Sequence, residues 1–363
     1  RHVPLHRQGL SGVFQVTRFT LAANNGEIGG GEVMLLNIAR AARNLGYKVT
    51  IVGPSEPKQL MEAAADEGFP RIMLPAKNRA QYMLALRAWH AQNKDVLLWC
   101  NGLVPAVATG GRKNRIVHLH QYATGINAKL VPFARRNASV TLVPSRYVAR
   151  ACPGSEVFAN WVNGVSTELD HHVGDRRLRV GFLGRLTPAK GIPTLCEALS
   201  ILNKDEIIYD FIIGGEPVFA SEEGRAEVET ALARVAPFST RLGWTTPDRL
   251  FSNIDMLVVP SAGAEESFGL VVAEAMSARI PVVISDAAPL MEVVGGNGSY
   301  PYIVPVNQPQ ALAQAIEKLG QEIREETEEL AERTSELFWR WQENYSPEAG
   351  KVRVGEILER FIR

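Results

Sequence analysis

Two glutamates, Glu266 and Glu274, lie on either side of the expected start of a helix. An apolar strand is expected over residues 254–259, and after a short loop the helix is expected to begin near Phe268, with Glu274 about two turns inside it. A ligand along this helix end could place hydroxyl groups at both carboxylates and a diphosphate over the free amides of the first turn. One segment could therefore hold both ends of a nucleotide sugar.

The pair alone does not decide the function. Acidic residues are favoured at the positive end of a helix dipole, so two glutamates near a helix start also occur where no ligand binds. Glu265 competes with Glu266 by proximity, although its spacing to Glu274 is one residue longer.

Two basic residues, Arg185 and Lys190, follow the strand expected over Leu178–Leu183, in a loop that contains Pro188 and Gly191. Breaking a sugar–phosphate bond builds negative charge on the leaving oxygen, which a guanidinium and an ammonium together can neutralise. Basic loop residues are more often simply solvated. Their place at a strand end, together with the family resemblance described below, favours a phosphate role.

Two histidines, His118 and His120, alternate along the strand expected over residues 115–119, so both point to one face. His-x-His can bind a metal, but no third ligand lies nearby in the sequence, and no metal site is expected. His118 is expected to be structural, and the neighbouring pair His171 and His172 is expected to be exposed.

These residues and their surroundings resemble a known family. Glu266-Ser-Phe-Gly-Leu through Glu274-Ala-Met, followed by Ile280-Pro-Val-Val, resembles the Glu-x7-Glu signature of GT4, a family of retaining glycosyltransferases with the GT-B fold. Residues 181–191 resemble the first strand and loop of that family's C-terminal domain, Asn163-Gly164-Val165 its inter-domain motif, and Gly29-Gly30-Gly31-Glu32 its N-terminal glycine loop. Each motif is weak singly, but they follow the family's order across almost the whole chain.

The resemblance implies a site, residue by residue. The catalytic residues would be Glu266, His120, Arg185 and Lys190. The donor would be bound by Gly29, Gly30, Arg185, Lys190, Gly243, Ser267, Phe268, Gly269, Leu270 and Glu274. Glu274 would accept hydrogen bonds from the ribose hydroxyls, and the glycine loop would close over the diphosphate. Glu32 is expected to cap its helix. No metal or cofactor is implied, since the nucleotide sugar is a substrate.

Two positions depart from the family pattern. Arg279 stands where the family often has glycine, and Ala288-Pro289 stands where a glycine pair commonly precedes the residue equivalent to Glu292. The first concerns a helix end, and the second puts the identity of the donor sugar in doubt.

Short apolar runs alternate with amphipathic helical segments, which is typical of parallel α/β sheets. Two Rossmann-like domains facing across a cleft are expected, with a polar linker over residues 160–175. The expected limits are 1–168 for the acceptor-side domain, 169–337 for the nucleotide-sugar domain and 338–363 for a helix returning to the first domain. The expected strands are Val13–Phe19, Lys48–Val52, Asp95–Cys100, Arg115–Leu119, Ser139–Val143, Leu178–Leu183, Tyr209–Ile213, Ile254–Val259 and Pro281–Ser285, and residues 308–336 are expected to form one long acidic helix.

Composition narrows the function classes. No run of about eighteen uncharged apolar residues occurs, so no membrane span is expected. The three cysteines are widely spaced, which favours reduced thiols and a cytoplasmic protein. The zero net charge combines a basic first half, with net charge +9 over residues 1–175, and an acidic second half, with −9. The basic half could contact a membrane surface peripherally. Alternatively, the two halves could simply present solvated faces that attract each other across the cleft. Binding of nucleic acid is not expected.

The expected function is transfer of a hexose, with retention, from a nucleoside diphosphate sugar to a glycan or lipid-linked acceptor. UDP-sugars are preferred over GDP-sugars, and polysaccharide or glycoconjugate biosynthesis is the expected setting. One alternative is a sugar-nucleotide epimerase of the non-hydrolysing type, and another is a non-catalytic binding subunit. A dinucleotide-dependent reductase fits poorly because Gly-x-Gly-x-x-Gly is missing from the glycine loop.

Overall fold

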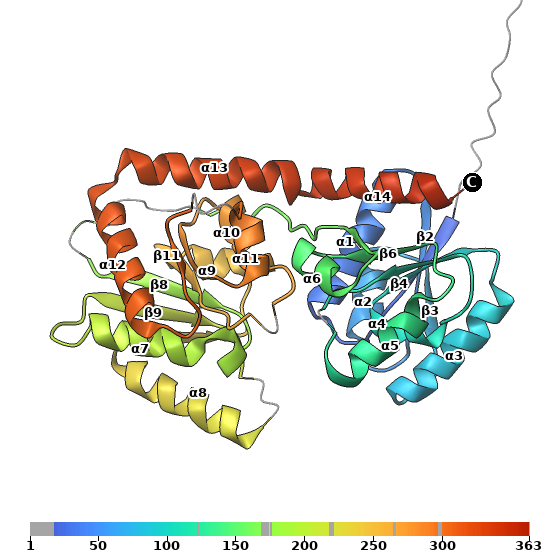
Figure 1. Ribbon diagram of the computed structural model, residues 1–363, viewed down its shortest axis with the longest axis horizontal. Helices are drawn as coiled ribbons and strands as arrows, with labels where there is room; N and C mark the ends of the chain where they lie inside the picture. Colours follow the sequence, from blue (N-terminus) through green and yellow to red (C-terminus); the bar gives the residue numbers. More distant parts are fainter. Residues whose placement is uncertain are drawn as a thin grey trace, which may run out of the picture.

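The computed structural model describes residues 18–121, 123–167, 174, 176–217, 221–263, 266–296 and 300–362. Two domains lie side by side, and two C-terminal helices run along one edge of both (Figure 1). Each domain contains one parallel sheet covered by helices, as the alternating pattern predicts. The expected GT-B architecture, including the returning C-terminal helix, is therefore confirmed.

The N-terminal sheet has the strand order β3-β2-β1-β4-β5-β6-β7. Its strands are β1 Arg18–Ala22, β2 Lys48–Pro54, β3 Arg71–Leu74, β4 Leu97–Asn101, β5 Arg115–His118, β6 Val140–Val143 and β7 Glu156–Val157. Its helices are α1 Gly30–Asn44, α2 Gln59–Asp66, α3 Arg79–Gln92, α4 Leu103–Ala108, α5 Gly125–Arg135 and α6 Arg146–Ala151. Every residue of β4, β5 and β6 is buried, as expected for central parallel strands with helices on both faces.

The C-terminal sheet has the order β10-β9-β8-β11-β12-β13. Its strands are β8 Leu178–Leu183, β9 Tyr209–Gly214, β10 Ser239–Gly243, β11 Met256–Val259, β12 Val282–Ser285 and β13 Ile303–Val304. Its helices are η1 Pro188–Lys190, α7 Ile192–Leu202, α8 Glu222–Val235, η2 Ala236–Phe238, α9 Pro247–Phe251, α10 Leu270–Ser277, α11 Ala288–Val294 and α12 Pro309–Glu325, followed by α13 Glu328–Asn344 and α14 Pro347–Phe361.

Both sheets reverse their strand order at one place, between β1 and β4 and between β8 and β11. Loops that leave neighbouring strands at such a switch point diverge to opposite faces, which opens a crevice beyond the carboxyl ends of the strands. The glycine loop follows β1, whereas Arg185 and Lys190 follow β8 and Glu266 follows β11. The two crevices therefore carry the residues that the motifs single out.

Several sequence expectations need correction. The first strand is Arg18–Ala22 rather than Val13–Phe19, and residues 1–17 lie outside the described part. The strands β3, β7, β10 and β13 were not expected. The acidic segment forms two helices rather than one, because the chain turns at Glu326, whose φ of 49° is left-handed, before Thr327 caps α13. His171 and His172 lie outside the described residues.

The C-terminal helices connect the two domains. Leu337 and Trp341 of α13 belong to the core of the C-terminal domain, whereas Val354 and Leu358 of α14 belong to the core of the N-terminal domain. Trp341 and Tyr345 are buried at the crossing, but Trp339 is 56% exposed and does not contribute to it. The crossing segment therefore consists of the second half of α13 and the whole of α14.

The linker passes directly beneath this crossing. The amide of Val162 donates to the carbonyl of Tyr345 at 3.0 Å, and the side-chain amide of Asn37 donates to the carbonyl of Trp161 at 3.2 Å. Trp161 is 2% exposed and lies against Gly350, where an added Cβ would be 2.2 Å from the indole ring. Gly350 is therefore the position at which α14 approaches the linker most closely.

We expect Gly350→Ala to lower the melting temperature, although alanine is the better helix former by about 1 kcal/mol. The methyl group would overlap the buried indole of Trp161, and overpacking of this kind typically costs about 1–3 kcal/mol. Thermal unfolding followed by circular dichroism tests this. Gly355→Ala is the matched control, because its Cβ would meet only a Leu45 methyl group at 3.5 Å and should stabilise the same helix. Equal melting temperatures for the two variants would contradict the assigned packing.

Arg279 stands in a backbone conformation that favours glycine, with φ of 58°, just after α10. Its guanidinium lies 4.1 Å from the centre of the Phe338 ring and donates to Ser335 Oγ at 2.9 Å. These contacts to α13 compensate the strained backbone, which explains how this departure from the family pattern is accommodated.

Candidate donor site between the domains

The strongest feature of the predicted site is an ion pair between the two loops of the C-terminal crevice. Lys190 Nζ lies 2.8 Å from Glu266 Oε2, and Ser261 Oγ donates to the same oxygen at 3.1 Å. The two side chains are only 19% and 11% exposed. The fold thus brings together two predicted residues that are far apart in the sequence, and it orients the ammonium toward the end of β11.

The loop that carries Lys190 is held rigidly by its backbone. Thr187 caps η1 by accepting from the Lys190 amide at 3.3 Å, and the carbonyl of Ala189 accepts from the Ala262 amide at 2.9 Å. Gly191 has φ of 77°, and a Cβ there would lie 2.1 Å from the carbonyl oxygen of Pro260. Only glycine allows the two loops to approach so closely.

Arg185 lies at the carboxyl end of the same crevice, directly after β8. It is exposed to solvent, and its carbonyl accepts from the amide of Thr187 at 3.0 Å. The adjacent Gly184 packs against Gly215 so tightly that a Cβ on Gly215 would lie 1.8 Å from the Gly184 carbonyl oxygen. The guanidinium is therefore carried by a backbone that has little freedom.

Glu274 lies in α10, whose first residue is Leu270 and not Phe268, so it is about one turn inside the helix rather than two. Its carboxyl group is largely buried, and burial raises its pKa to about 7. No hydrogen bond to this carboxylate occurs among the described residues. A buried acceptor without a protein partner at this place is available to hydroxyl groups of a ligand.

The start of α10 is shaped by Gly269, which has φ of 103° and packs against Leu290. Phe268 is 4% exposed, and its ring stacks edge-on with Tyr345 at a centroid distance of 5.3 Å. Its side chain therefore belongs to the core, so any contact of Phe268 with a donor would use the backbone. Ser267 is half-buried beside it, and Glu265 lies outside the described residues.

The glycine loop of the N-terminal domain faces this helix start. A Cβ on Gly30 would lie 3.4 Å from Leu270 Cδ1, so the two predicted donor-binding segments meet across the domain interface. Gly29 is the N-cap of α1, and its amide donates to Glu32 Oε2 at 3.3 Å. Glu32 is buried, which raises its pKa to about 7, and it caps the helix as expected.

His120 lies beside the same loop. A Cβ on Gly31 would be 3.3 Å from His120 Cδ2, and the rings of His118 and His120 are 4.1 Å apart, on one face as predicted. Burial lowers the pKa of His120 to about 4, so the ring is neutral near pH 7. His118 is fully buried among Trp99 and Phe158, consistent with a structural role.

Gly243 ends β10 with φ of 67°, and its carbonyl accepts from the Gly215 amide at 2.7 Å. The next residue, Trp244, is 77% exposed, and its amide donates to Glu216 Oε1 at 3.0 Å. Its indole is accessible for stacking, but nothing in the described residues orients it toward a base.

Family models match both domains. A model described as Glycosyltransferase Family 4 matches residues 28–155, and one described as Glycosyl transferases group 1 matches residues 170–336. Each domain of the chain thus matches a glycosyltransferase family model, and together the two domains have the GT-B fold. An uncharacterized glycosyltransferase of Methanocaldococcus jannaschii is 26% identical over 165 residues, a match that spans 45% of this chain but only 41% of that relative.

Several solved structures share this fold along most of their length. Anabaena HepE in complex with UDP and glucose has a TM-score of 0.79 at 19% identity, covering 94% of this chain and 99% of HepE. A glycosyltransferase from Rickettsia africae has a TM-score of 0.75 at 15% identity, covering 96% and 99%. HepE was also crystallised with UDP-glucose, with a TM-score of 0.78 at 20% identity and coverage of 94% and 99%.

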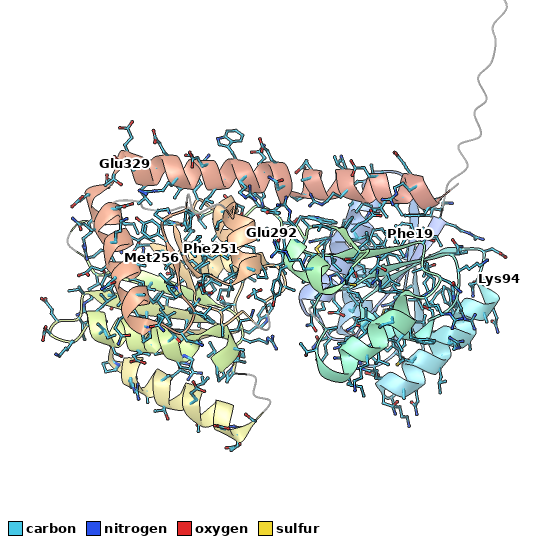
Figure 2. All side chains as sticks on the ribbon, viewed as in Figure 1. Phe19, Lys94, Phe251, Met256, Glu292 and Glu329 are labelled. Carbon is cyan, nitrogen blue, oxygen red and sulfur yellow. The ribbon has the colours of Figure 1, made fainter. Side chains whose placement is uncertain are left out.

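Three further polar residues with side-chain contacts were not anticipated. Ser261 binds Glu266, Asn101 binds both His120 and Gly31, and Glu292 accepts from the amide of Arg146 with both carboxylate oxygens at 3.0 and 2.9 Å. Glu292, labelled in Figure 2, thus caps α6 of the other domain. Polar residues directly after buried strands are the signal that could have indicated Ser261 and Asn101.

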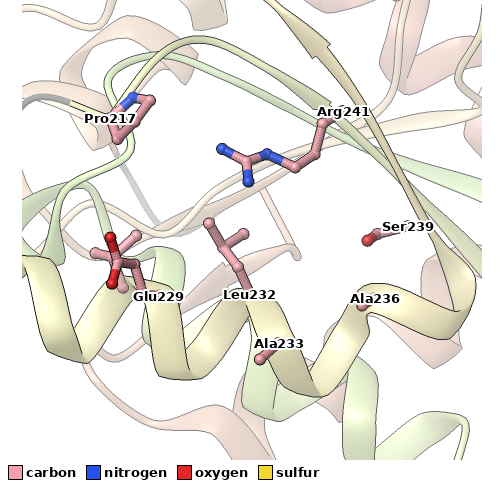
Figure 3. A pocket seen from close by; sticks show the side chains of 8 residues that line it. Pro217, Glu229, Leu232, Ala233, Ala236, Ser239 and Arg241 are labelled. Atoms are coloured by element: carbon pink, nitrogen blue, oxygen red, sulfur yellow. The ribbon is translucent and has the colours of Figure 1, made fainter.

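One well-defined hollow lies away from the predicted donor residues. A hollow of about 560 Å³ lies between α8 and the edge strand β10, lined by Pro217, Glu229, Leu232, Ser239 and Arg241 among others (Figure 3). None of the predicted donor residues lines this hollow, so it is not part of the candidate donor site.

The described residues contain no cluster of histidine, cysteine, aspartate or glutamate that could hold a metal ion.

One basic residue of the N-terminal half does not contribute to a charged surface. Arg115 is completely buried and donates to the carbonyls of Ala106, Ala134 and Arg136 as well as to Thr109 Oγ1. It therefore holds the N-terminal domain together and adds nothing to a surface for anionic partners.

No helix among the described residues is long and apolar enough to cross a membrane.

Proposed function

We propose that this chain transfers a hexose from a nucleoside diphosphate sugar, preferably a UDP-sugar, to a glycan or lipid-linked acceptor with retention of anomeric configuration. The observation that carries the proposal is the Lys190–Glu266 pair, which lies at the switch point of the C-terminal sheet. Its glutamate is on the same segment as Glu274. HepE, which shares the fold, was crystallised with UDP and with UDP-glucose, which supports the choice of uracil.

Each residue has a task in this proposal. Arg185 and Lys190 neutralise the charge that develops on the leaving diphosphate, and Glu266 keeps the Lys190 ammonium in place while its other oxygen accepts from the sugar. Glu274 binds the ribose hydroxyls. Gly29 and Gly30 bring the N-terminal backbone close to the phosphates, and His120 faces the sugar. Among the described residues no covalent nucleophile is evident, so the leaving phosphate would take the acceptor's proton on the same face of the sugar.

The first test is ligand-induced thermal stabilisation. UDP and UDP-glucose should raise the melting temperature, whereas GDP should not, and Glu274→Ala should abolish the shift. Glu62→Ala, an exposed glutamate on α2, is the control and should leave the shift unchanged. No shift with any nucleotide would favour a non-catalytic subunit, and conversion of UDP-glucose to another UDP-sugar without an acceptor would favour an epimerase. A transfer product with inverted configuration would disprove the retaining mechanism.

The same assay has a pH dependence. The folded-state pKa of Glu274 is raised from 4.5 to about 7, so ionisation of this group destabilises the free protein progressively as pH rises from about 4.5 to 7. The ionised carboxylate is the better acceptor for ribose hydroxyls, so the affinity for UDP should increase as pH rises from 6 to 8. Glu274→Gln should remove this increase.

A further inference from the structure

Asn101 connects the two functional segments of the N-terminal domain. It is the last residue of β4, at the switch point of the sheet, and it is fully buried. Its Nδ2 donates to the carbonyl of Gly31 at 2.8 Å, and its Oδ1 lies 2.8 Å from Nε2 of His120. One side chain thus contacts both the glycine loop and the histidine that is predicted to face the sugar.

These two bonds fix the protonation of the histidine ring. The Gly31 carbonyl can only accept, so the amide nitrogen of Asn101 must face it and the amide oxygen must face His120. An oxygen acceptor requires a hydrogen on Nε2, and because the ring is neutral near pH 7, its Nδ1 carries a lone pair. That Nδ1 is buried and has no partner among the described residues.

The surroundings leave the ring little freedom to rotate. His118 packs on one side with a centroid distance of 4.1 Å, and Gly31 approaches on another. His118 has no hydrogen-bond partner among the described residues, and burial keeps its pKa well below the usual value, so it supplies neither charge nor a competing bond. Asn101 is therefore the residue that determines which nitrogen of His120 is protonated.

We propose that Asn101 is a positioning residue of the donor site, which locks His120 in the Nε2-protonated form and ties it to the glycine loop. His120 then offers its Nδ1 lone pair as an acceptor for a hydroxyl group of the bound sugar. This inference rests on the proposed function for its ligand, but the assignment of the tautomer does not.

The test combines a spectroscopic and a kinetic measurement on the full chain. Nitrogen-15 NMR of histidine-labelled protein at pH 9, where every imidazole is neutral, should show an Nε2-protonated His120, identified by its loss in His120→Gln. Asn101→Leu should give a mixture of the two tautomers. It should also lower kcat/KM for UDP-glucose by about 10- to 100-fold, by analogy with the loss of a hydrogen-bond partner behind a metal-binding histidine.

Two variants separate this role from a general loss of stability. Asn101→Asp keeps an acceptor for Nε2 but cannot donate to Gly31, so it should retain the tautomer and raise KM for UDP-glucose. Asn24→Leu removes a neighbouring bond, from the Val104 amide at 3.0 Å, without touching His120, and should leave the tautomer unchanged.

An Asn101→Leu protein with a pure Nε2 tautomer and kcat/KM within twofold of wild type would overturn the assignment. If the tautomer changes as expected but wild-type protein neither binds nor turns over UDP-glucose, the position of Asn101 is correct and the proposed function is wrong.

Discussion

Arg185→Ala is expected to lower kcat by about 100- to 1000-fold, the loss seen when one preorganised donor to a developing negative charge is removed. The guanidinium follows β8 at the crevice where the diphosphate is proposed to bind, so its main effect should be on the leaving group in the transition state. The rate of UDP release from UDP-glucose, with and without an acceptor glycan, measures this. The dissociation constant for UDP should change less than kcat.

Arg177→Ala is the matched control for this experiment. Arg177 precedes the same strand, at its amino end, and is exposed beside Asp210. It has the same charge as Arg185 and flanks the same strand, but lies at the opposite end of that strand. Comparable losses in the two variants, or near-normal turnover of Arg185→Ala, would show that Arg185 has no special role.

Lys190→Met is expected to reduce both stability and turnover, and the two effects can be separated. Without the ammonium, the carboxylate of Glu266 is left largely buried, and Ser261 is its only remaining side-chain partner among the described residues. This should cost on the order of 3 kcal/mol. Turnover should fall about 100-fold through the loss of charge at the leaving group. Chemical denaturation and UDP release from UDP-glucose measure the two quantities.

The double variant Lys190→Met/Glu266→Gln gives the decisive comparison. A neutral glutamine no longer needs the cation, so the stability of the double variant should return most of the way to that of wild type. Its turnover should stay low, because the leaving group still lacks the ammonium. Recovery of turnover together with stability would mean that the pair is only structural.

The pattern of apolar runs predicted the central strands well because they are buried on both faces and rich in branched residues, as in the all-buried β11 and β12. The missed strands lie at or near sheet edges, where the pattern is weaker. β10, with the sequence Ser-Thr-Arg-Leu-Gly, has no fully buried residue, and β7 and β13 have only two residues each.

The site was predictable to the extent that its residues occupy strand ends. Arg185, Lys190 and Glu266 follow strands that the sequence indicates, and strand neighbours in a parallel sheet bring such loops together. The ion pair itself was not predictable, because it depends on the approach of two loops at Gly191. Asn101 and Glu292 were missed because their partners belong to other segments, and Glu292 even caps a helix of the other domain.

The linker and the C-terminal helices cross between the domains side by side, joined where Val162 binds Tyr345. Two rigid bodies connected at a single point can turn about three axes, but two adjacent connections along one edge leave essentially one. The two domains of this chain should therefore open and close by rotation about a single hinge axis. Gly30 and Leu270 belong to opposite domains, so the angle between the two domains determines whether the donor site is complete. Ligand binding should therefore change this one inter-domain angle.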